Sequence, residues 1–207
     1  NAAGENEMSD NNNRKTLGST VLLSCLVLGT AQAGAADAPL AQAAQIGDMY
    51  TAGQHLAAGA DPNAVGAFAT PALHWVVHYG DAELAERMLQ AGADPNLANA
   101  STGVTPLSLA LDGTDPDLVA LLLEAGADPN AQLPDGDTHL MHAARTQIPA
   151  FVQLLVEHGA EVDARHAEFG YTALMLAANA GDLASVKFLL QHGADPDAAT
   201  TRIGKEN

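Results

Sequence analysis

Apolar residues recur along the chain in pairs of short stretches, and polar turns separate the two members of each pair. Between residues 105 and 130 the stretches read LSLAL and DLVALLLEA, with Leu and Val at the spacing that places side chains on one face of a helix. Each stretch is too short to bury its apolar face alone. The pattern therefore predicts short helices in pairs that pack against neighbouring pairs.

Residues of the third pair show where its helices begin and end. Thr105 can act as an N-cap and Pro106 suits the first helical position, and Asp115-Pro116 repeats this arrangement for the second helix. Gly126 can take the left-handed conformation that ends a helix. Asp128-Pro129-Asn130 then favours a turn, because proline cannot continue a helix and Asp and Asn bond to their own turns.

This unit repeats along the chain at a fixed period. The glycine of the Gly-Ala-Asp/Glu element recurs at steps of 33, 34, 33 and 34, at Gly59, Gly92, Gly126, Gly159 and Gly193. A second marker keeps the same step and precedes the first helix of each unit: APLA (38–41), PALH (71–74), TPLS (105–108), THLM (138–141) and TALM (172–175). Such a period is typical of a stacked array, and five units exceed the three or so that a stable stack needs.

Two units depart from the common pattern. The second carries Pro71 where the third, fourth and fifth have a capping Thr, and Val76-Val77 in place of the pair of alanines that lets first helices approach closely. The fourth has Ile148 in place of the capping acid before Pro149. We expect the second unit to splay slightly, and its sequence marks the start of its first helix less clearly than in the third unit.

The five markers, each followed by a second apolar stretch and Gly-Ala-Asp or Gly-Ala-Glu, resemble the ankyrin-repeat family of the bacterial exported type, over about Asp37 to Asp197. The resemblance implies an all-α repeat solenoid of about five repeats in one curved domain, each a helix-turn-helix with a β-hairpin or loop. The expected domain spans 34–197, with repeats near 34–66, 67–99, 100–133, 134–166 and 167–200 and a tail at 198–207. It also implies a non-enzymatic module that binds a protein partner through the concave face of the first helices and the hairpin fingers.

Positions equivalent to that face and those fingers give the candidate partner-binding residues: Phe68, Tyr79, His78, Asp112, Asp135, Asp137, Arg145, Phe169, Tyr171 and Asn179. Exposed aromatic residues around a polar centre are typical of interface hot spots. Each position also has a structural alternative. The polar residues can be ordinary solvated surface, Phe68 and Phe169 can pack inside their hairpins, and Trp75 is expected to pack against the next helix.

The charge is strongly negative, with 25 acidic and 8 basic residues and a net charge of −17. Nucleic-acid binding needs a basic face, so this class is excluded. From Gly34 onward there are 22 acidic and 6 basic residues, which favours a partner with a basic patch. The alternative is that the charge serves solubility alone.

No residue pattern predicts catalysis, a cofactor, a small-molecule substrate or a metal. His74 and His78 have metal-ligand spacing, but His74 stands where the ankyrin family uses histidine for bonds between repeats. His139 and His142 are a similar isolated pair. The segment Asp135-Gly136-Asp137 lacks the ligand spacing of a calcium loop and indicates an acidic hairpin tip. We therefore expect a monomeric binding protein and no enzyme.

Residues 1–33 have the pattern of an N-terminal extension with a signal peptide. Arg14-Lys15 precedes a charge-free run at 16–36, and Ala31-Gln32-Ala33 supplies the small residues of a cleavage site after Ala33. Removal there would leave a cysteine-free chain in the periplasm or outside the cell. Two alternatives stay open. Cys25 follows a segment that resembles a bacterial lipobox, which would give a membrane-tethered adaptor, or the run stays uncleaved as an anchor. A third possibility is a secreted effector-type binder.

Overall fold

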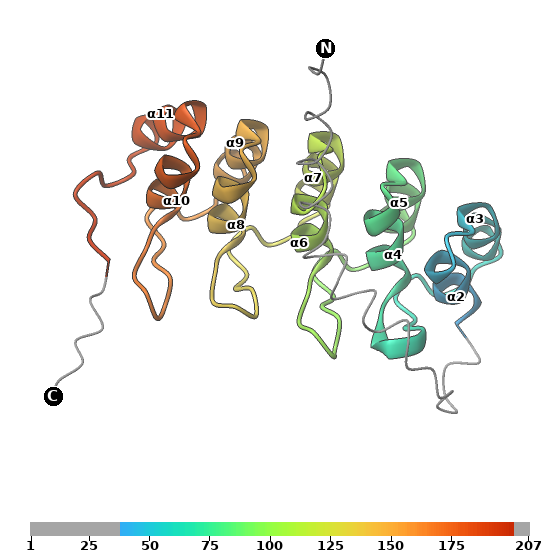
Figure 1. The fold of residues 1–207 in the computed structure, drawn as a ribbon. Helices are drawn as coiled ribbons and strands as arrows, with labels where there is room; N and C mark the ends of the chain where they lie inside the picture. Colours follow the sequence, from blue (N-terminus) through green and yellow to red (C-terminus); the bar gives the residue numbers. More distant parts are fainter. Residues whose placement is uncertain (1–37, 201–207) are drawn as a thin grey trace, which may run out of the picture.

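A computed structural model describes residues 38–200, which form ten α-helices in five successive pairs (Figure 1). The pairs are α2 (Pro39–Gln45) with α3 (Met49–Ala57), α4 (Ala72–Tyr79) with α5 (Ala82–Gln90), α6 (Pro106–Leu111) with α7 (Pro116–Glu124), α8 (His139–Thr146) with α9 (Pro149–Glu157), and α10 (Ala173–Ala180) with α11 (Leu183–Gln191). None of these helices is long and apolar enough to cross a membrane. The predicted signal sequence, its cleavage point and Cys25 lie outside the described residues.

The five pairs stack side by side in a curved two-layer array (Figure 1). The first helices α2, α4, α6, α8 and α10 form one layer and the second helices form the other. Loops between pairs project from the first-helix side as fingers, and each finger takes the number of the repeat whose first helix follows it. Among the described residues the fingers contain isolated β-bridges, Val65 with Pro71 and Gln132 with Thr138, and one 3-10 turn, η2 (Ala67–Ala69). The predicted all-α repeat solenoid is confirmed.

The predicted helix limits of the third repeat are also confirmed. Thr105 and Ser108 form a reciprocal capping box at the start of α6, and Pro106 takes the first helical position. Asp115 accepts a bond from the Asp117 amide at the start of α7. Helix α7 ends at Glu124, and Gly126 has a φ of 92°, the left-handed conformation that the sequence predicted.

The two unusual helix starts lack a side-chain cap, as expected from the sequence. Pro71 precedes α4 and Ile148 precedes α9, and neither supplies a capping bond. Before α9, the Ile148 amide donates instead to Thr146 Oγ1 at 3.2 Å. Gln147 takes a φ of 60° there, where the turns of the first, second and fifth repeats have a glycine with positive φ.

One apolar core runs the length of the stack. Leucines at one register position are fully buried in successive repeats, as Leu73, Leu107 and Leu140 show, and so are Val119 and Val152. A fully buried leucine contributes roughly 1.5–3 kcal/mol relative to an exposed one, and most of that burial comes from the adjacent repeats. The repeats therefore stabilise one another.

Asparagines that follow the Gly-Ala-Asp-Pro turns join each repeat to the next. Asn63 Nδ2 donates to the Gly92 carbonyl at 2.8 Å, and its Oδ1 accepts from the Asp94 amide at 2.8 Å. Asn96 makes the same pair of bonds to Gly126 and Asp128, and Asn130 makes them to Gly159 and Glu161. We call this two-bond contact the Asn clamp. The sequence predicted that the Gly, Asp and Pro of this motif end the helix and form the turn. It did not predict the two bonds of the Asn clamp.

The fourth repeat has no asparagine at this position. Asp163 replaces it and accepts from the Asp195 amide at 2.9 Å, but a carboxylate has no N–H group to donate to a carbonyl. The junction between repeats four and five therefore lacks half of the clamp, and other contacts, described next, join these two repeats.

Candidate functional site

Side chains at the ends of the first helices and the bases of the fingers form a row across repeats two to five. We call it the first-helix row: Tyr79, His78, Asp112, His142, Arg145 and Tyr171. Its members come from α4, the residue that caps α6, α8 and the segment just before α10. Regular stacking lines up His78, Asp112 and Arg145, because these three occupy equivalent positions in successive repeats.

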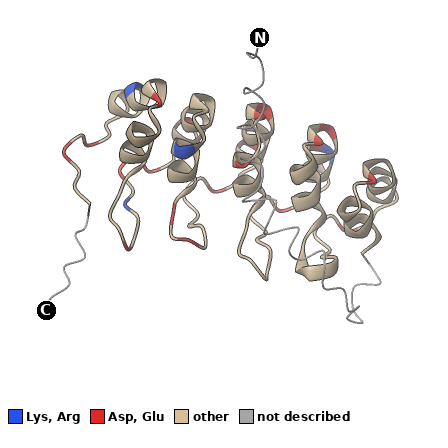
Figure 2. Ribbon diagram, viewed as in Figure 1, with Lys and Arg blue, Asp and Glu red and all other residues tan. Residues whose placement is uncertain are grey.

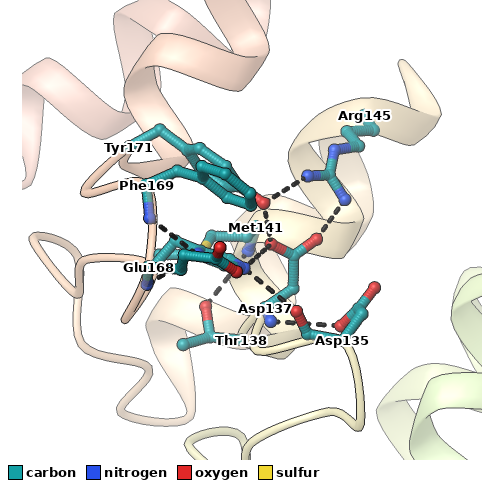
Figure 3. A network of polar contacts seen from close by, with 9 residues as sticks. Asp135, Asp137, Thr138, Met141, Arg145, Glu168, Phe169 and Tyr171 are labelled. Carbon is teal, nitrogen blue, oxygen red and sulfur yellow. Dashed lines mark hydrogen bonds and ion pairs between the residues drawn. The ribbon is translucent and has the colours of Figure 1, made fainter. Parts of the chain in front are cut away.

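A buried carboxylate organises the end of the row at repeats four and five (Figure 3). Asp137 is 1% exposed, at the base of the fourth finger. Tyr171 Oη, from the next repeat, donates to Asp137 Oδ1 at 2.7 Å, and Arg145 Nη1 forms an ion pair with Asp137 Oδ2. Arg145 Nη2 also donates to Tyr171 Oη at 3.0 Å. The three side chains form a closed triangle of contacts.

The triangle explains how an acid can be buried there. A buried carboxylate is costly unless it is paired and hydrogen-bonded, and Asp137 has both kinds of partner. Burial alone would lower the pKa of Arg145, but Asp137 outweighs it and holds that pKa above its ordinary value. The pKa of Tyr171 is also raised, first by desolvation and then by its bond to Asp137. Arg145 and Tyr171 are therefore held in fixed orientations with their usual protonation.

Aromatic rings extend this cluster to the tip of the fifth finger. The His166 ring centroid lies 4.5 Å from that of Tyr171 and 5.0 Å from that of Phe169. His166 Nδ1 accepts from the Glu168 and Phe169 amides, and its Nε2 donates to the Asp135 carbonyl at 3.0 Å. Phe169 remains 44% exposed although it stacks on a buried histidine. The finger thus presents a rigid aromatic surface to solvent.

The middle of the row contains an acid and two histidines from three repeats. Asp112 Oδ1 lies 3.0 Å from His142 Nε2, and both side chains are partly exposed. The pKa of His78 is lowered mainly by burial, and the nearby Asp112 carboxylate partly opposes this effect. The arrangement is polar and open to a partner.

Tyr79 forms the other end of the row. It is 51% exposed, its Oη donates to the Gln45 carbonyl at 3.3 Å, and its ring meets that of His78 edge to face at 5.3 Å. Ile46, at the end of α2, is also exposed. The first two repeats thus present apolar surface beside the polar middle of the row.

The remaining predicted contact residues are not members of the row, although Asn179 occupies the position of the fifth repeat that is equivalent to Arg145. Phe68 is half-buried in the second finger with a φ of 60°, and its carbonyl accepts from Ser101 Oγ at 3.3 Å. Asn179 is exposed near the end of α10. Asp135 is exposed, and its Oδ1 accepts from the Asp137 amide at 3.1 Å.

The prediction for Asp137 needs a correction. The sequence predicted that it lies at an exposed acidic tip, whereas the structure buries it. The fourth finger turns at Gly136, so the chain runs inward at Asp137 and its side chain meets Arg145 of its own repeat and Tyr171 of the next. Asp137 positions two candidate contact residues and is too buried to be a contact itself.

Residues that shape the fingers were not predicted from the sequence. Asn99 is buried and accepts from the Ser101 and Thr102 amides, while its Nδ2 donates to Thr70 Oγ1 at 2.6 Å. In the fifth finger, His166 likewise accepts from the amides two and three residues further along the chain. Both residues lie four positions before a glycine with positive φ, Gly103 or Gly170, and this spacing was the available signal.

His74 has the structural use predicted for it, and His139, at a different position of its repeat, also contacts a neighbouring repeat. His74 Nε2 donates to the Val104 carbonyl of the next repeat at 2.9 Å, and His139 Nε2 lies 3.2 Å from Thr105 Oγ1 of the preceding repeat. Burial lowers the pKa of both, that of His139 to about 4. Between residues 38 and 200, no group of three or more His, Cys, Asp or Glu side chains is placed to hold a metal ion.

Comparison with known families decides the classification. A family profile described as "Ankyrin repeats (3 copies)" matches residues 40–133 and 110–200, which together span most of the chain. The chain belongs to the ankyrin-repeat family. None of the curated proteins compared with the chain matches it. Ankyrin repeats are generally protein–protein interaction modules and are typically non-enzymatic, so the first-helix row of this ankyrin array is its candidate binding surface.

Proposed function

We propose that this ankyrin-repeat protein is an exported, non-enzymatic module that binds a protein partner through its concave face, formed by the first-helix row and the fingers. The main support is the Asp137 cluster, which fixes Arg145 and Tyr171 beside the exposed ring of Phe169. A buried ion pair of this kind is not needed for a stable ankyrin junction, because the Asn clamp joins the earlier repeats without one.

The physical advantage of the cluster for binding is preorganisation. Interface energy concentrates in a few rigid aromatic and arginine side chains, and a side chain that is already fixed loses little conformational entropy on binding. Tyr171 and Arg145 are fixed by Asp137, and Phe169 is fixed by His166. These residues are the anchors that we expect to contact the partner.

The expected partner carries a basic patch. Asp112, Asp135 and Glu168 are exposed along the same surface, and Arg145 is already neutralised by Asp137. Acidic residues also outnumber basic residues elsewhere on the array (Figure 2). Complementary charge speeds the encounter of partners and fixes their orientation, more than it adds affinity. Association should therefore slow markedly as salt is raised.

Partner capture from periplasmic extract, with the unprocessed chain and its variants as crosslinking bait, tests this proposal. The variant is Phe169→Ser with Tyr79→Ser, two exposed positions whose replacement spares the core. The control is Tyr50→Ser, an exposed aromatic residue of α3 outside the row. We expect one protein that the parent and the control enrich and that the double variant loses. Equal recovery by all three baits would contradict the proposal.

Export is supported by the sequence of residues 14–36 and is tested separately. The mass of the processed N-terminus and the compartment in which the chain is found together distinguish the three possibilities. A free N-terminus at Gly34 in the periplasm supports the exported module, whereas acylated Cys25 supports a membrane-tethered adaptor. A chain found mainly in the culture medium supports a secreted effector-type binder.

A further inference from the structure

The helix pair α10–α11 leaves one side of the fifth repeat open. We define the end face as Met175, Ala178, Val186 and Leu190. Most of their equivalents inside the array are buried: Met141, Ala144 and Val152 are 0% exposed, and the Leu190 position is buried at Leu56 and Leu123 and half-buried at Leu89 and Val156. At the end face Leu190 is 43% exposed, Ala178 is exposed, and Met175 and Val186 are half-buried. The side chains remain apolar although no described repeat covers them.

The end face continues an interface that the molecule already uses. Leu56 of α3 stands at the position of Leu190 and is buried by the second repeat. The same side of every repeat therefore receives the helix pair that follows it. By register and composition, the end face has the properties of a packing surface.

The opposite end of the array is different. Thr51, Gln54 and His55 of α3 occupy the positions that Phe151, Leu154 and Leu155 hold in α9. Phe151 and Leu155 are fully buried, whereas Thr51 and His55 are partly exposed and Gln54 is exposed. The first repeat thus has the polar outer side that keeps a repeat array soluble, and the fifth repeat does not.

The two helices of the end face also carry no carboxylate. Neither α10 nor α11 contains an Asp or Glu, and the same holds for α2 and α3 at the opposite, more polar end of the array. Lys187 is the charged residue within α10 and α11, and Asp182 lies just before α11. Repulsion between two acidic copies of the chain is therefore weak where their end faces meet.

From these observations we propose that two copies of the chain associate through their end faces about a twofold axis. A second copy presents an identical apolar and carboxylate-free surface, so the contact is self-complementary and closed. Head-to-tail stacking is disfavoured because it would bury Thr51, Gln54 and His55 against the apolar end face. This dimer replaces the monomer expected from the sequence. It places two first-helix rows in one assembly, which would raise the avidity for a partner with two binding sites.

Sedimentation equilibrium of the full chain tests the dimer. The end face is small, so association is expected to be weak and to be visible between about 5 and 200 µM. Leu190→Lys places a charge in the end face and should raise the dissociation constant at least about tenfold. The matched control is Leu183→Lys. Leu183 is 62% exposed on α11, and none of its equivalents Met49, Ala82, Pro116 and Pro149 is more than half-buried inside the array, so it lies outside the end face.

The same variants distinguish a dimer through the end face from association through another part of the chain. Association through residues outside the described range would persist in Leu190→Lys, because all variants share those residues. If Leu190→Lys lowers the helical circular dichroism, Ala178→Glu on α10 tests the same face from an exposed position. A parent chain that stays monomeric up to about 200 µM, or equal effects of the two lysines, would overturn the dimer. If the parent chain stays monomeric, the occupant of the end face would instead be a helix pair of another polypeptide. Partner capture by the first-helix row is measured independently.

Discussion

The junction between repeats three and four and the junction between repeats four and five are held by different chemistry. At the first, the Asn clamp of Asn130 bonds the turn of the next repeat at two points. At the second, Asp163 makes one of these bonds, and the triangle of Asp137, Arg145 and Tyr171 joins the two repeats on the finger side. One stacking geometry can thus be maintained by neutral bonds at an exposed turn or by a buried ion pair beside the candidate binding surface.

The largest expected effect comes from removing the buried carboxylate. Asp137→Ala leaves Tyr171 and the partly buried Arg145 without their partner, and we expect a loss of about 3 kcal/mol in the free energy of unfolding. Amide hydrogen exchange should show the loss mainly in α10 and α11, because solenoid repeats contact only their neighbours. Asp135→Ala is the control at an exposed position in the same finger. A loss below about 0.5 kcal/mol would show that the triangle does not hold this junction.

Acid should weaken the junction between repeats three and four through His139, which is 1% exposed and contacts Thr105. Its folded pKa is about 4, below the ordinary 6.5 of the unfolded chain. Between these values the unfolded state binds more protons, so the stability present above pH 6.5 is lost as the pH falls towards 4. The contribution is roughly 2–3 kcal/mol.

Denaturant unfolding at a series of pH values measures this effect. His139→Asn should flatten the fall in stability between pH 6.5 and 4, although burial lowers the pKa of His74 and His78 as well and part of the slope will remain. His192→Asn, the same substitution at an exposed position of the fifth repeat, provides the control. An identical slope in the parent and in His139→Asn would exclude His139 as the source.

Breaking the Asn clamp should have an intermediate effect. Asn130→Ala removes bonds of 2.9 and 2.8 Å to the Gly159 carbonyl and the Glu161 amide. We expect a loss of about 1–2 kcal/mol, because each such bond contributes about 1 kcal/mol net. Asn130→Asp keeps the acceptor and removes the donor, so urea denaturation should place it between the parent and the alanine variant. Equal stability of all three proteins would show that the clamp adds nothing to this junction.

Completing the clamp at Asp163 should have the smallest effect, and it should raise the stability where the other changes lower it. Asp163→Asn supplies an N–H group that can reach the Gly193 carbonyl, the equivalent of Gly159, and should stabilise repeat five by about 0.5–1 kcal/mol. The melting temperature of Asp163→Asn should rise, most clearly when combined with Asp137→Ala. A gain that is the same with and without Asp137→Ala would show that the two contacts act independently.

Much of the fold followed from local sequence signals. Thr105, Pro106 and Gly126 act on their own backbone or on the adjacent turn, so their effect can be read without knowing which residues are distant neighbours. The Asn clamp could have been suspected from the recurrence of Asn63, Asn96 and Asn130, but its targets lie one repeat away. The burial of Asp137 could not be read locally, because it depends on Arg145 and Tyr171 arriving at the same point from two different repeats.

The sequence by itself determined the period, the pairing of short helices and the positions of their caps, because these depend on contacts within a few residues and on repetition. It also determined the acidic charge and the residue types along the first-helix row. Tertiary stacking decided which of those residues are surface and which are support, since burial depends on the neighbouring repeat. It buried Asp137, exposed Phe169 and left the apolar end face of the fifth repeat open, because only the assembled array shows which sides have no described neighbour.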